Sequence, residues 1–300
     1  MTFSIIVPTY NRLSSLKKAL ESLFHQDYKD YEIIVVNDGC KDGTAEYLVQ
    51  AVHEHGIRVV ELSDLGIAAA RNRGAEAARG NILAFLDDDC SVYPTWLRDL
   101  EAALQRNRAS LVFGNVSNVL LESDYSVVHH EMNQFLINRM NCDPLHPRFV
   151  LTSSFACDPK LFKQYGGFDE RFYFGSEDRE LIGRLLASGE HVAFDKDIVA
   201  EHRHHFTLRS FLFYYYRLGR GSHLLYNVAN KEKLLGLKTN PIWNIITMLS
   251  TVGKGKGLFR RFHLIILAFL AQFFIWLGFI YARFVRISDL RRENISETRP

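Results

Sequence analysis

Residues 81–89 read Asn-Ile-Leu-Ala-Phe-Leu-Asp-Asp-Asp, an apolar run that ends in three consecutive carboxylates. A short, continuous apolar run is typical of a strand that is buried on both faces. The chain before it repeats this pattern, with apolar residues at helical spacing between the runs. We expect strands at Ser4–Val7, Glu32–Asn37, Ile57–Glu61 and Asn81–Leu86, and helices at Leu13–Phe24, Thr44–His53 and Ile67–Arg79. This alternation predicts an α/β fold, with a mostly parallel, Rossmann-like sheet flanked by helices.

Polar segments follow three of the expected strands. They are Pro8–Arg12, Asp38–Gly43 and Asp87–Asp89. Ligands of open α/β sheets bind beyond the carboxyl ends of the strands. We therefore expect these three segments to line one crevice.

The second half of the chain is less regular. We expect a helix after Pro94, a strand at Phe149–Ala156, an amphipathic helix at Glu177–Ala187 and an aromatic-rich helix from Leu208 to about Leu225. The segment from Leu120 to Cys142 is ambiguous, with some helical character.

Composition sets limits on function. The 300 residues are 47% hydrophobic and 23% charged, which is ordinary for a globular protein. A net charge of +2 gives no reason to expect nucleic acid as a partner. The four cysteines form no CxxC pair, which favours a reducing compartment over a disulfide framework.

The C-terminal part carries a strongly apolar run, Leu264–Ala282, flanked by arginines on both sides. Its nineteen residues nearly cross a hydrocarbon core of roughly 30 Å. We expect a domain at 1–230 and a helical, membrane-associated region at 231–300, with a break near Gly253–Gly257. A buried core helix is the alternative. Met1 leads directly into the first strand, so we expect no signal peptide.

The acidic triplet Asp87–Asp89 is the sharpest chemical signal. Three adjacent carboxylates repel one another unless a cation neutralises them. Mg²⁺ or Mn²⁺ binds such carboxylates together with phosphates, and a sugar diphosphate leaving group needs the same charge neutralisation. The alternative is a solvated acidic turn.

Other segments carry weaker signals. Asp38 could accept hydrogen bonds from a nucleobase or ribose, or simply close an Asx turn. Arg71 and Arg73 could reach a phosphate or base, or form a solvated basic face. Glu177 and Asp178 stand in the first turn of their helix, where a carboxylate either pairs with the helix dipole or acts as a general base.

The histidines His202, His204 and His205 form a small cluster. His202 is a candidate third metal ligand, and plain surface histidines are the alternative. The cations Arg203, Arg209, Arg217 and Arg220 lie among Phe211 and Tyr214–Tyr216, where they either face lipid phosphates or pack within the domain.

Together these motifs resemble the family 2 glycosyltransferases, over roughly residues 3–225. The resemblance rests on five motifs in order: Ile6–Arg12, Val36–Thr44, Ala70–Gly74, Phe85–Asp89, and Gly167–Glu170 with Glu177-Asp178. The family has the nucleotide-sugar-binding GT-A fold, and its members transfer sugar with inversion in one displacement.

The resemblance implies roles for individual residues. The nucleotide-sugar donor would contact Pro8, Thr9, Tyr10, Arg12, Asp38, Arg71, Asp87 and Asp88, with Asp88 at the ribose. Asp89 would bind the metal, Mn²⁺ or Mg²⁺, and Asp87 with Asp89 would form the DXD pattern. Asp178 would be the base and Glu177 would support acceptor binding.

Departures from the family's motifs limit the donor contacts and the kind of reaction that we expect. Only one carboxylate stands in Asn37-Asp38, and Cys40 and Lys41 replace small hydroxylated residues. The Gln-x-x-Arg-Trp motif of processive synthases is absent after the Glu-Asp helix, which favours transfer of a single sugar. UDP is the default nucleotide. The acceptor is a glycan or lipid-linked molecule, as in polysaccharide biosynthesis, with the catalytic domain on the cytoplasmic side of a membrane.

Two alternatives remain at this level. A nucleotidyltransferase has a related sheet and acidic metal site, but it would normally carry a glycine-rich loop after the first strand, which Pro8–Arg12 lacks. A non-catalytic nucleotide-sugar-binding scaffold would lack the base, yet Asp178 is present. Oligomeric state has no signature in the sequence.

Overall fold

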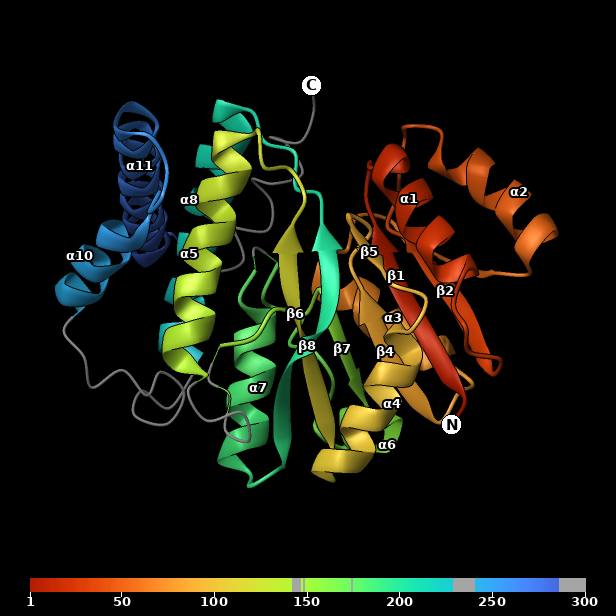
Figure 1. Ribbon diagram of the computed structural model, residues 1–300. Coiled ribbons are helices and arrows are strands. Elements are labelled where there is room, and N and C mark those ends of the chain that lie inside the picture. Colours follow the sequence, from red (N-terminus) through yellow and green to blue (C-terminus); the bar gives the residue numbers. More distant parts are fainter. Residues whose placement is uncertain (142–146, 148, 174, 229–240, 286–300) are drawn as a thin grey trace.

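The computed structural model describes residues 1–141, 147, 149–173, 175–228 and 241–285. Within them, one eight-stranded sheet has the order β3-β2-β1-β4-β7-β6-β8-β5 (Figure 1). The strands are β1 (Phe3–Thr9), β2 (Tyr31–Asn37), β3 (Arg58–Glu61), β4 (Ile82–Leu86), β5 (Cys90–Val92), β6 (Leu111–Asn118), β7 (Ser154–Cys157) and β8 (Val192–His202). Only β7 and β5 run against the others. The expected mostly parallel α/β sheet is confirmed.

Helices cover both faces of the sheet. They are α1 (Leu13–Phe24), α2 (Thr44–His55), α3 (Ile67–Ala77), α4 (Trp96–Asn107), α6 (Pro159–Gln164) and α7 (Glu177–Ala187). Alternate residues of one strand feed opposite faces: Ile5 and Val7 pack with α1 and α4, while Ile6 packs with α3 and α7. Both faces of β1 are therefore buried, which is why its central residues Ile5, Ile6 and Val7 are all apolar.

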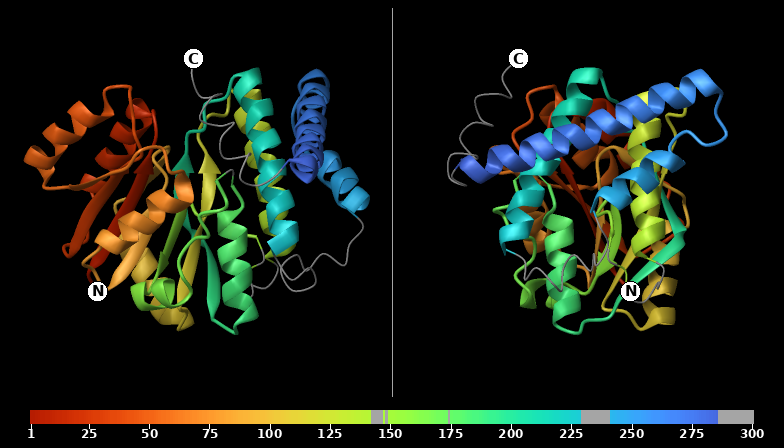
Figure 2. Two further views of the ribbon diagram at one scale, coloured as in Figure 1. Left: turned by 180° about the vertical axis from the view of Figure 1, so that it is seen from behind. Right: turned by 90° about the vertical axis from the view of Figure 1, so that its left-hand side faces the viewer.

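A further helical layer stands beside the β6–β8 side of the sheet (Figures 1 and 2). It comprises α5 (Asp124–Met140), α8 (Leu208–Val228), α10 (Pro241–Thr251) and α11 (Leu258–Phe284), which share one apolar cluster. The ambiguous segment from Leu120 is therefore mainly helical. Its last residue, Cys142, and the expected domain boundary near 230 lie outside the described residues.

Three strands, β5, β6 and β8, were not expected from the sequence. In β8 the polar run Asp195–Asp197 looks like a surface loop, but it lies at an irregularity where the pairing with β6 shifts between Gly114 and Asn115. The expected strand Phe149–Ala156 was too long at its start, because only Ser154–Cys157 pairs with β4 and β6.

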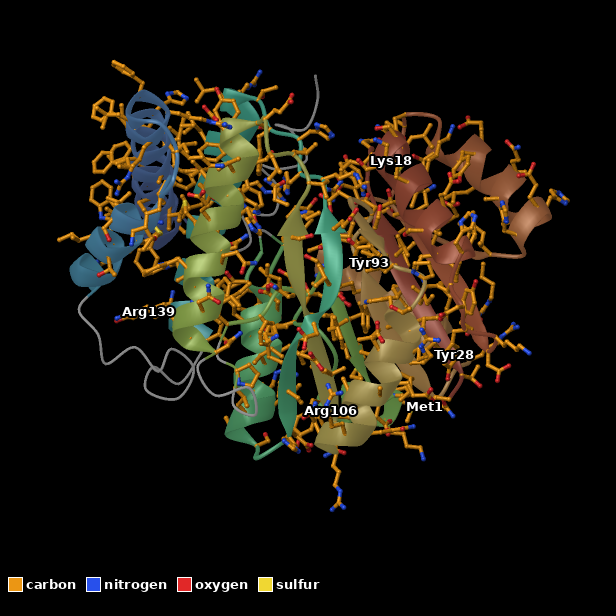
Figure 3. All side chains as sticks on the ribbon, in the orientation of Figure 1. Met1, Lys18, Tyr28, Tyr93, Arg106 and Arg139 are labelled. Atoms are coloured by element: carbon orange, nitrogen blue, oxygen red, sulfur yellow. The ribbon has the colours of Figure 1, made fainter. Side chains whose placement is uncertain are left out.

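On the side of the molecule away from this helical layer, polar contacts join residues that are distant in the sequence. At the amino end of the sheet, the Tyr28 hydroxyl lies 3.0 Å from the amino group of Met1, and both residues are labelled in Figure 3. The opposite end of the sheet, where the parallel strands finish, carries the polar segments that the sequence singled out.

Gly74 sets how closely α3 approaches the sheet. A Cβ atom at this position would lie 2.4 Å from Cγ2 of Ile6 and 3.0 Å from Cγ2 of Val36. We predict that Gly74→Val lowers the free energy of unfolding by about 1–3 kcal/mol, the usual range for an overpacked core. Denaturant titration measures it.

The matched control for this variant is Gly257→Ala. Gly257 has a φ of −57° and open space around a built Cβ. Equal loss of stability in the two variants would show that the α3 contact is not tight.

Candidate active site

The three polar segments meet at the carboxyl ends of β1, β2 and β4. The Thr9 hydroxyl donates to Oδ2 of Asp88 at 2.7 Å, and the Asp38 amide donates to the Thr9 carbonyl at 3.0 Å. Parallel strands bring their ends to the same edge of a sheet, and the expected convergence of these segments is observed. Pro8 lies in β1 opposite Val36, and Tyr10 is half-buried just beyond the strand.

Asp38 is engaged by the loop before α3. Its two carboxylate oxygens accept hydrogen bonds from the amides of Leu65 and Gly66, at 2.8 and 2.7 Å. Burial raises the pKa of Asp38 in spite of these bonds. The ring of Tyr173 closes against Gly66, where a Cβ would lie 2.6 Å from the ring.

Arginines neutralise the acidic triplet from two sides. Arg71 contacts Oδ1 of Asp87 at 2.6 Å, while Arg12 lies 3.0 Å from Asp88 and 2.6 Å from Asp89. Guanidinium groups therefore neutralise part of the triplet's charge, and charge repulsion alone does not require a metal ion there. Asp88 is fully buried, and burial raises its pKa.

Arg71 also joins the triplet to α7. Its second terminal nitrogen contacts Oε1 of Glu177 at 2.7 Å, and only 3% of its side chain is exposed. The alternative of a solvated basic face is thus wrong for Arg71. It fits Arg73, which is 37% exposed and pairs with Glu76 and Glu170.

Asp178 follows Glu177 at the start of α7 and is half-buried. Burial and the neighbouring Glu177 raise the pKa of Asp178 to about 7. Its Oδ1 accepts a hydrogen bond from the amide of Arg179. Ser176 precedes the helix with a φ of 75° and makes no capping hydrogen bond through its side chain. A carboxylate in this setting can take up a proton near neutral pH.

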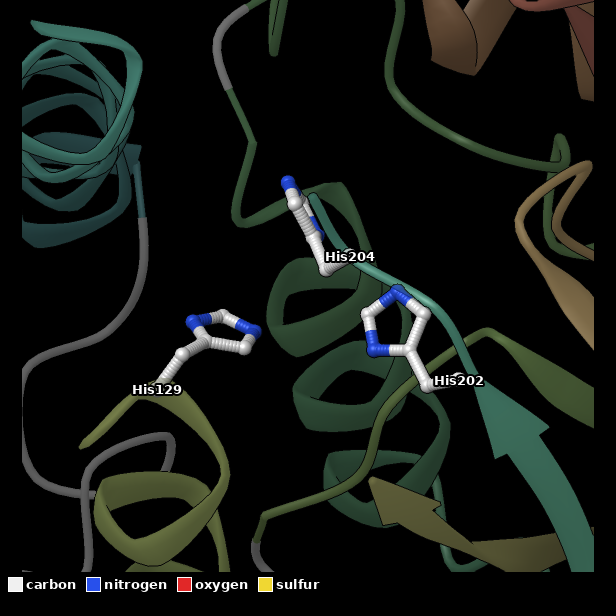
Figure 4. Close-up of side chains that lie close together, drawn as sticks. All are labelled: His129, His202 and His204. Carbon is white, nitrogen blue, oxygen red and sulfur yellow. The ribbon is translucent and has the colours of Figure 1, made fainter. Parts of the chain in front are cut away.

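Histidines from two elements surround Asp89. Nε2 of His202 lies 3.2 Å from Oδ1 of Asp89, and Nδ1 of His204 lies 3.8 Å from Oδ2. His129 of α5 completes a group whose ligand atoms lie within 4.8 Å of one another (Figure 4). The surface alternative holds for the exposed His205 and is wrong for His202 and His204.

Charge is distributed unequally in this group. Burial opposes the charge of Asp89, but His202 and Arg12 hold its pKa well below the usual value. Burial lowers the pKa of His204 to about 3 and holds that of His129 well below its ordinary value. His129 was missed because it stands in α5, more than seventy residues from the other two, with no motif around it.

The donor set fits a divalent cation. Oδ1 of Asp89 faces His202, Oδ2 of the same carboxylate pairs with Arg12, and Asp87 has one oxygen beyond its contact with Arg71. Carboxylate and imidazole ligands suit Mn²⁺, and carboxylate with phosphate suits Mg²⁺. These residues therefore form a candidate metal centre at the sheet edge.

The arginines expected among the aromatic residues of α8 either pack within the domain or are exposed. Arg203 contacts Ser91 and Glu201, and Arg209 is exposed. Arg220 is buried between the rings of Tyr216 and Tyr281. Arg203 and Arg220 therefore make contacts within the domain, as the packing alternative expected.

The α/β sheet thus carries an acidic triplet, the buried Arg71 and a carboxylate pair at its strand ends, which is the edge where α/β sheets bind their ligands. The family model of glycosyl transferase family 2 matches residues 4–166. The match covers more than half of the chain, which therefore belongs to glycosyl transferase family 2. Membership of this family decides against the nucleotidyltransferase alternative.

Curated relatives agree with the family. The chain is 38% identical over 117 residues to the glycosyltransferase AglE of Haloferax volcanii, which is 38% of each chain. It is 34% identical over 113 residues to the glycosyltransferase GlyA of Streptococcus pneumoniae, covering 37% of this chain and 16% of the relative. The aligned region thus spans well under two thirds of these relatives.

Solved structures share the fold. The mannosyltransferase PcManGT from Pyrobaculum calidifontis, in complex with GDP-Man and Mn²⁺, superposes with a TM-score of 0.66 at 17% identity, covering 94% of this chain and 87% of that one. TarS 1-349 of S. aureus, in complex with UDP-GlcNAc, gives 0.55 at 16% identity, covering 93% and 89%. The GT-A type of fold is thereby confirmed.

The buried bridge through Arg71 generates a stability prediction. Arg71→Met leaves Asp87 and Glu177 without their shared partner, and removal of one member of a buried ion pair costs about 3–5 kcal/mol. We expect this loss in a denaturant titration of the purified chain.

Arg73→Met is the matched control for this variant, two residues along the same helix. Its ion pairs are exposed, so the free energy of unfolding should change by less than about 1 kcal/mol. A similar small change in Arg71→Met would show that the bridge does not hold α3, β4 and α7 together.

Proposed function

We propose that the chain is an inverting glycosyltransferase that moves a single sugar from a nucleotide-diphosphate sugar to a hydroxyl of a glycan or lipid-linked acceptor. The observation that carries this proposal is the contact of one guanidinium, Arg71, with both Asp87 and Glu177. It sets a carboxylate with a pKa near neutrality, Asp178, beside the acidic triplet. Donor site and base thus occupy one edge of the sheet.

The donor would lie along the strand ends. Pro8, Thr9, Tyr10 and Asp38 would hold the nucleobase end and Asp88 the ribose, with Arg12 and Arg71 near the diphosphate. The complexes of the two structural neighbours, with GDP-Man and with UDP-GlcNAc, support a nucleotide sugar without choosing the nucleotide. UDP is our default.

Asp89 and Asp87, with His202 as third ligand, would hold Mn²⁺ or Mg²⁺. The cation supplies charge neutralisation for the diphosphate as it leaves. The Mn²⁺ in the mannosyltransferase complex supports this assignment.

The reaction is a single displacement at the anomeric carbon. The acceptor oxygen forms a bond to that carbon while the bond to the diphosphate oxygen breaks, and the nucleoside diphosphate leaves with the electron pair. Asp178 takes the proton from the acceptor hydroxyl. Glu177, its neighbour in the first turn of α7, supports acceptor binding. Both carboxylates come from one helix turn, so their spacing is set by backbone geometry.

The acceptor would be met at a membrane. One helix, Leu258–Phe284, is long and apolar enough to cross a bilayer. It supports association through the C-terminal region. We further propose that the catalytic domain lies on the cytoplasmic side and that nucleic acid has no role.

Donor hydrolysis tests the proposed class. The purified chain is incubated with a panel of nucleotide sugars and Mn²⁺ or Mg²⁺, and released nucleotide is measured. We expect slow turnover of one donor that EDTA abolishes. If no nucleotide is released and no nucleotide shifts the thermal unfolding midpoint, the non-catalytic scaffold replaces the enzyme.

Asp89 is the residue on which the proposed metal site depends most. We predict that Asp89→Asn abolishes Mn²⁺-supported binding of the donor, because the variant loses the charged ligand next to His202. Isothermal titration calorimetry with and without Mn²⁺ measures it. Asp30→Asn, at an exposed turn before β2, is the control, and binding equal to that control would refute the ligand role.

Asp178 carries the base assignment. We predict that Asp178→Asn keeps donor binding but lowers the transfer rate by about 10²–10⁴-fold, the general-base range. Full transfer activity in this variant would place the base elsewhere.

The pH profile is the second readout for Asp178. The base works only when deprotonated, and its pKa is raised to about 7, so kcat should fall as pH drops through about 7. The Asp178→Asn variant should lose this limb. Because Asp88 also has a raised pKa, donor binding is measured over the same range to separate the two carboxylates.

A further inference from the structure

The helix α11 has two apolar faces. Its inner face packs on α5, α8 and α10 through a buried set with steps of three and four residues. The buried residues are Leu264, Leu267, Ala268, Ala271, Gly278 and Ala282. This face is composed mainly of small or aliphatic side chains, as expected for close helix packing.

The outer face carries a row of large apolar side chains, mostly aromatic, with the same spacing but half a turn away. Phe259, Phe262, Ile266, Phe269, Phe273, Trp276 and Phe284 are each between 41% and 91% exposed. Figure 3 shows rings projecting from this side of α11, away from the sheet. Monomeric soluble proteins rarely expose such a continuous apolar row.

The helix is fixed to the domain along its length. Near its start, Arg260 pairs with Asp124 of α5 at 2.8 Å. Further on, a Cβ built on Gly278 would lie 2.0 Å from the Tyr216 carbonyl oxygen, and one on Gly219 would lie 2.0 Å from that of Ile275. Backbones in such close contact cannot separate without losing the inner face.

The attachment of α11 to the domain distinguishes a helix that spans a bilayer from one that lies in its surface. Figure 2 shows α11 lying across the outer side of the α5 and α8 layer. If α11 crossed the hydrocarbon core while docked, it would draw α8 into the bilayer with it, including Arg220, which lies against Gly278 and the Tyr281 ring. Buried charges in hydrocarbon are costly.

Basic residues stand at both ends of the exposed row. Lys254 and Lys256 are exposed in the turn before α11, and Arg283 is exposed in its last turn. Cations beside an apolar face complement the anionic surface of a membrane.

We propose that α11 lies in the plane of an anionic membrane surface, with the row from Phe259 to Phe284 inserted among the lipid acyl chains and the lysines at the headgroups. The lipid surface then lies one helix layer away from the candidate site, because α8 contacts α11 on one side and the histidine group on the other. Tyr214 of α8 lies 5.1 Å from His129 and 5.3 Å from His204, between ring centroids. This places the site beside the membrane surface, within reach of a lipid-linked acceptor.

The test is flotation of the full chain with vesicles of phosphatidylcholine, with and without phosphatidylglycerol. We expect binding that is stronger with phosphatidylglycerol, and a drop of at least about tenfold in the partition coefficient for Phe269→Ser with Trp276→Ser. The control, Val49→Ser with Val52→Ser, removes exposed apolar side chains of α2 and should bind as the parent does. Unchanged circular dichroism and an unchanged thermal unfolding midpoint show that each variant is folded.

Orientation is read from two single variants, Lys254→Cys and Arg283→Cys, added to preformed vesicles. An in-plane helix leaves both thiols reactive toward a membrane-impermeant maleimide, as resolved by mass spectrometry. Protection of one thiol until the vesicles are lysed would show a spanning helix and overturn the proposal. So would lack of vesicle binding with a concentration-dependent dimer that the serine variant abolishes. Neither readout depends on sugar transfer, so the proposed function can fail independently.

Discussion

The ion pairs of Arg71 are the constraint on which the site depends. A guanidinium that is almost fully buried must find partners, because an uncompensated charge away from water is strongly destabilising. Arg71 finds Asp87 after β4 and Glu177 at the start of α7, segments separated by ninety residues of sequence. The same contacts that satisfy the charge therefore fix the distance between the acidic triplet and Asp178.

Burial and neighbouring charges together set the pKa values of the carboxylates at this edge of the sheet. Arg12 and His202 hold Asp89 ionised, whereas Asp88 and Asp178 have raised pKa values. Three kinds of carboxylate thus meet at this edge of the sheet: one held ionised by His202 and Arg12, one buried against Thr9, and one able to exchange a proton near neutral pH. This division suits a reaction that needs both charge neutralisation and proton transfer.

The helical layer links the site to a surface. Two close glycine contacts lock α11 onto α8, and α8 in turn presents Tyr214 to the histidine group. A membrane bound at the outer face of α11 would hold the catalytic edge at a fixed height and tilt. For a transferase with a lipid-linked acceptor, this arrangement would confine the search for substrate to a plane.

The sequence by itself determined the first four strands, their order of alternation with helices, and the polar segments at their ends, because buried parallel strands require unbroken apolar runs whose breaks mark the sheet edge. It also gave Asp87–Asp89, Glu177-Asp178 and the apolar C-terminal run. Only the tertiary structure decided that Arg12 and Arg71 neutralise the triplet, that His129 joins His202 and His204, and that α11 has a covered and an open face. These depend on contacts between segments distant along the chain, and no local pattern records which side chains meet when the elements pack.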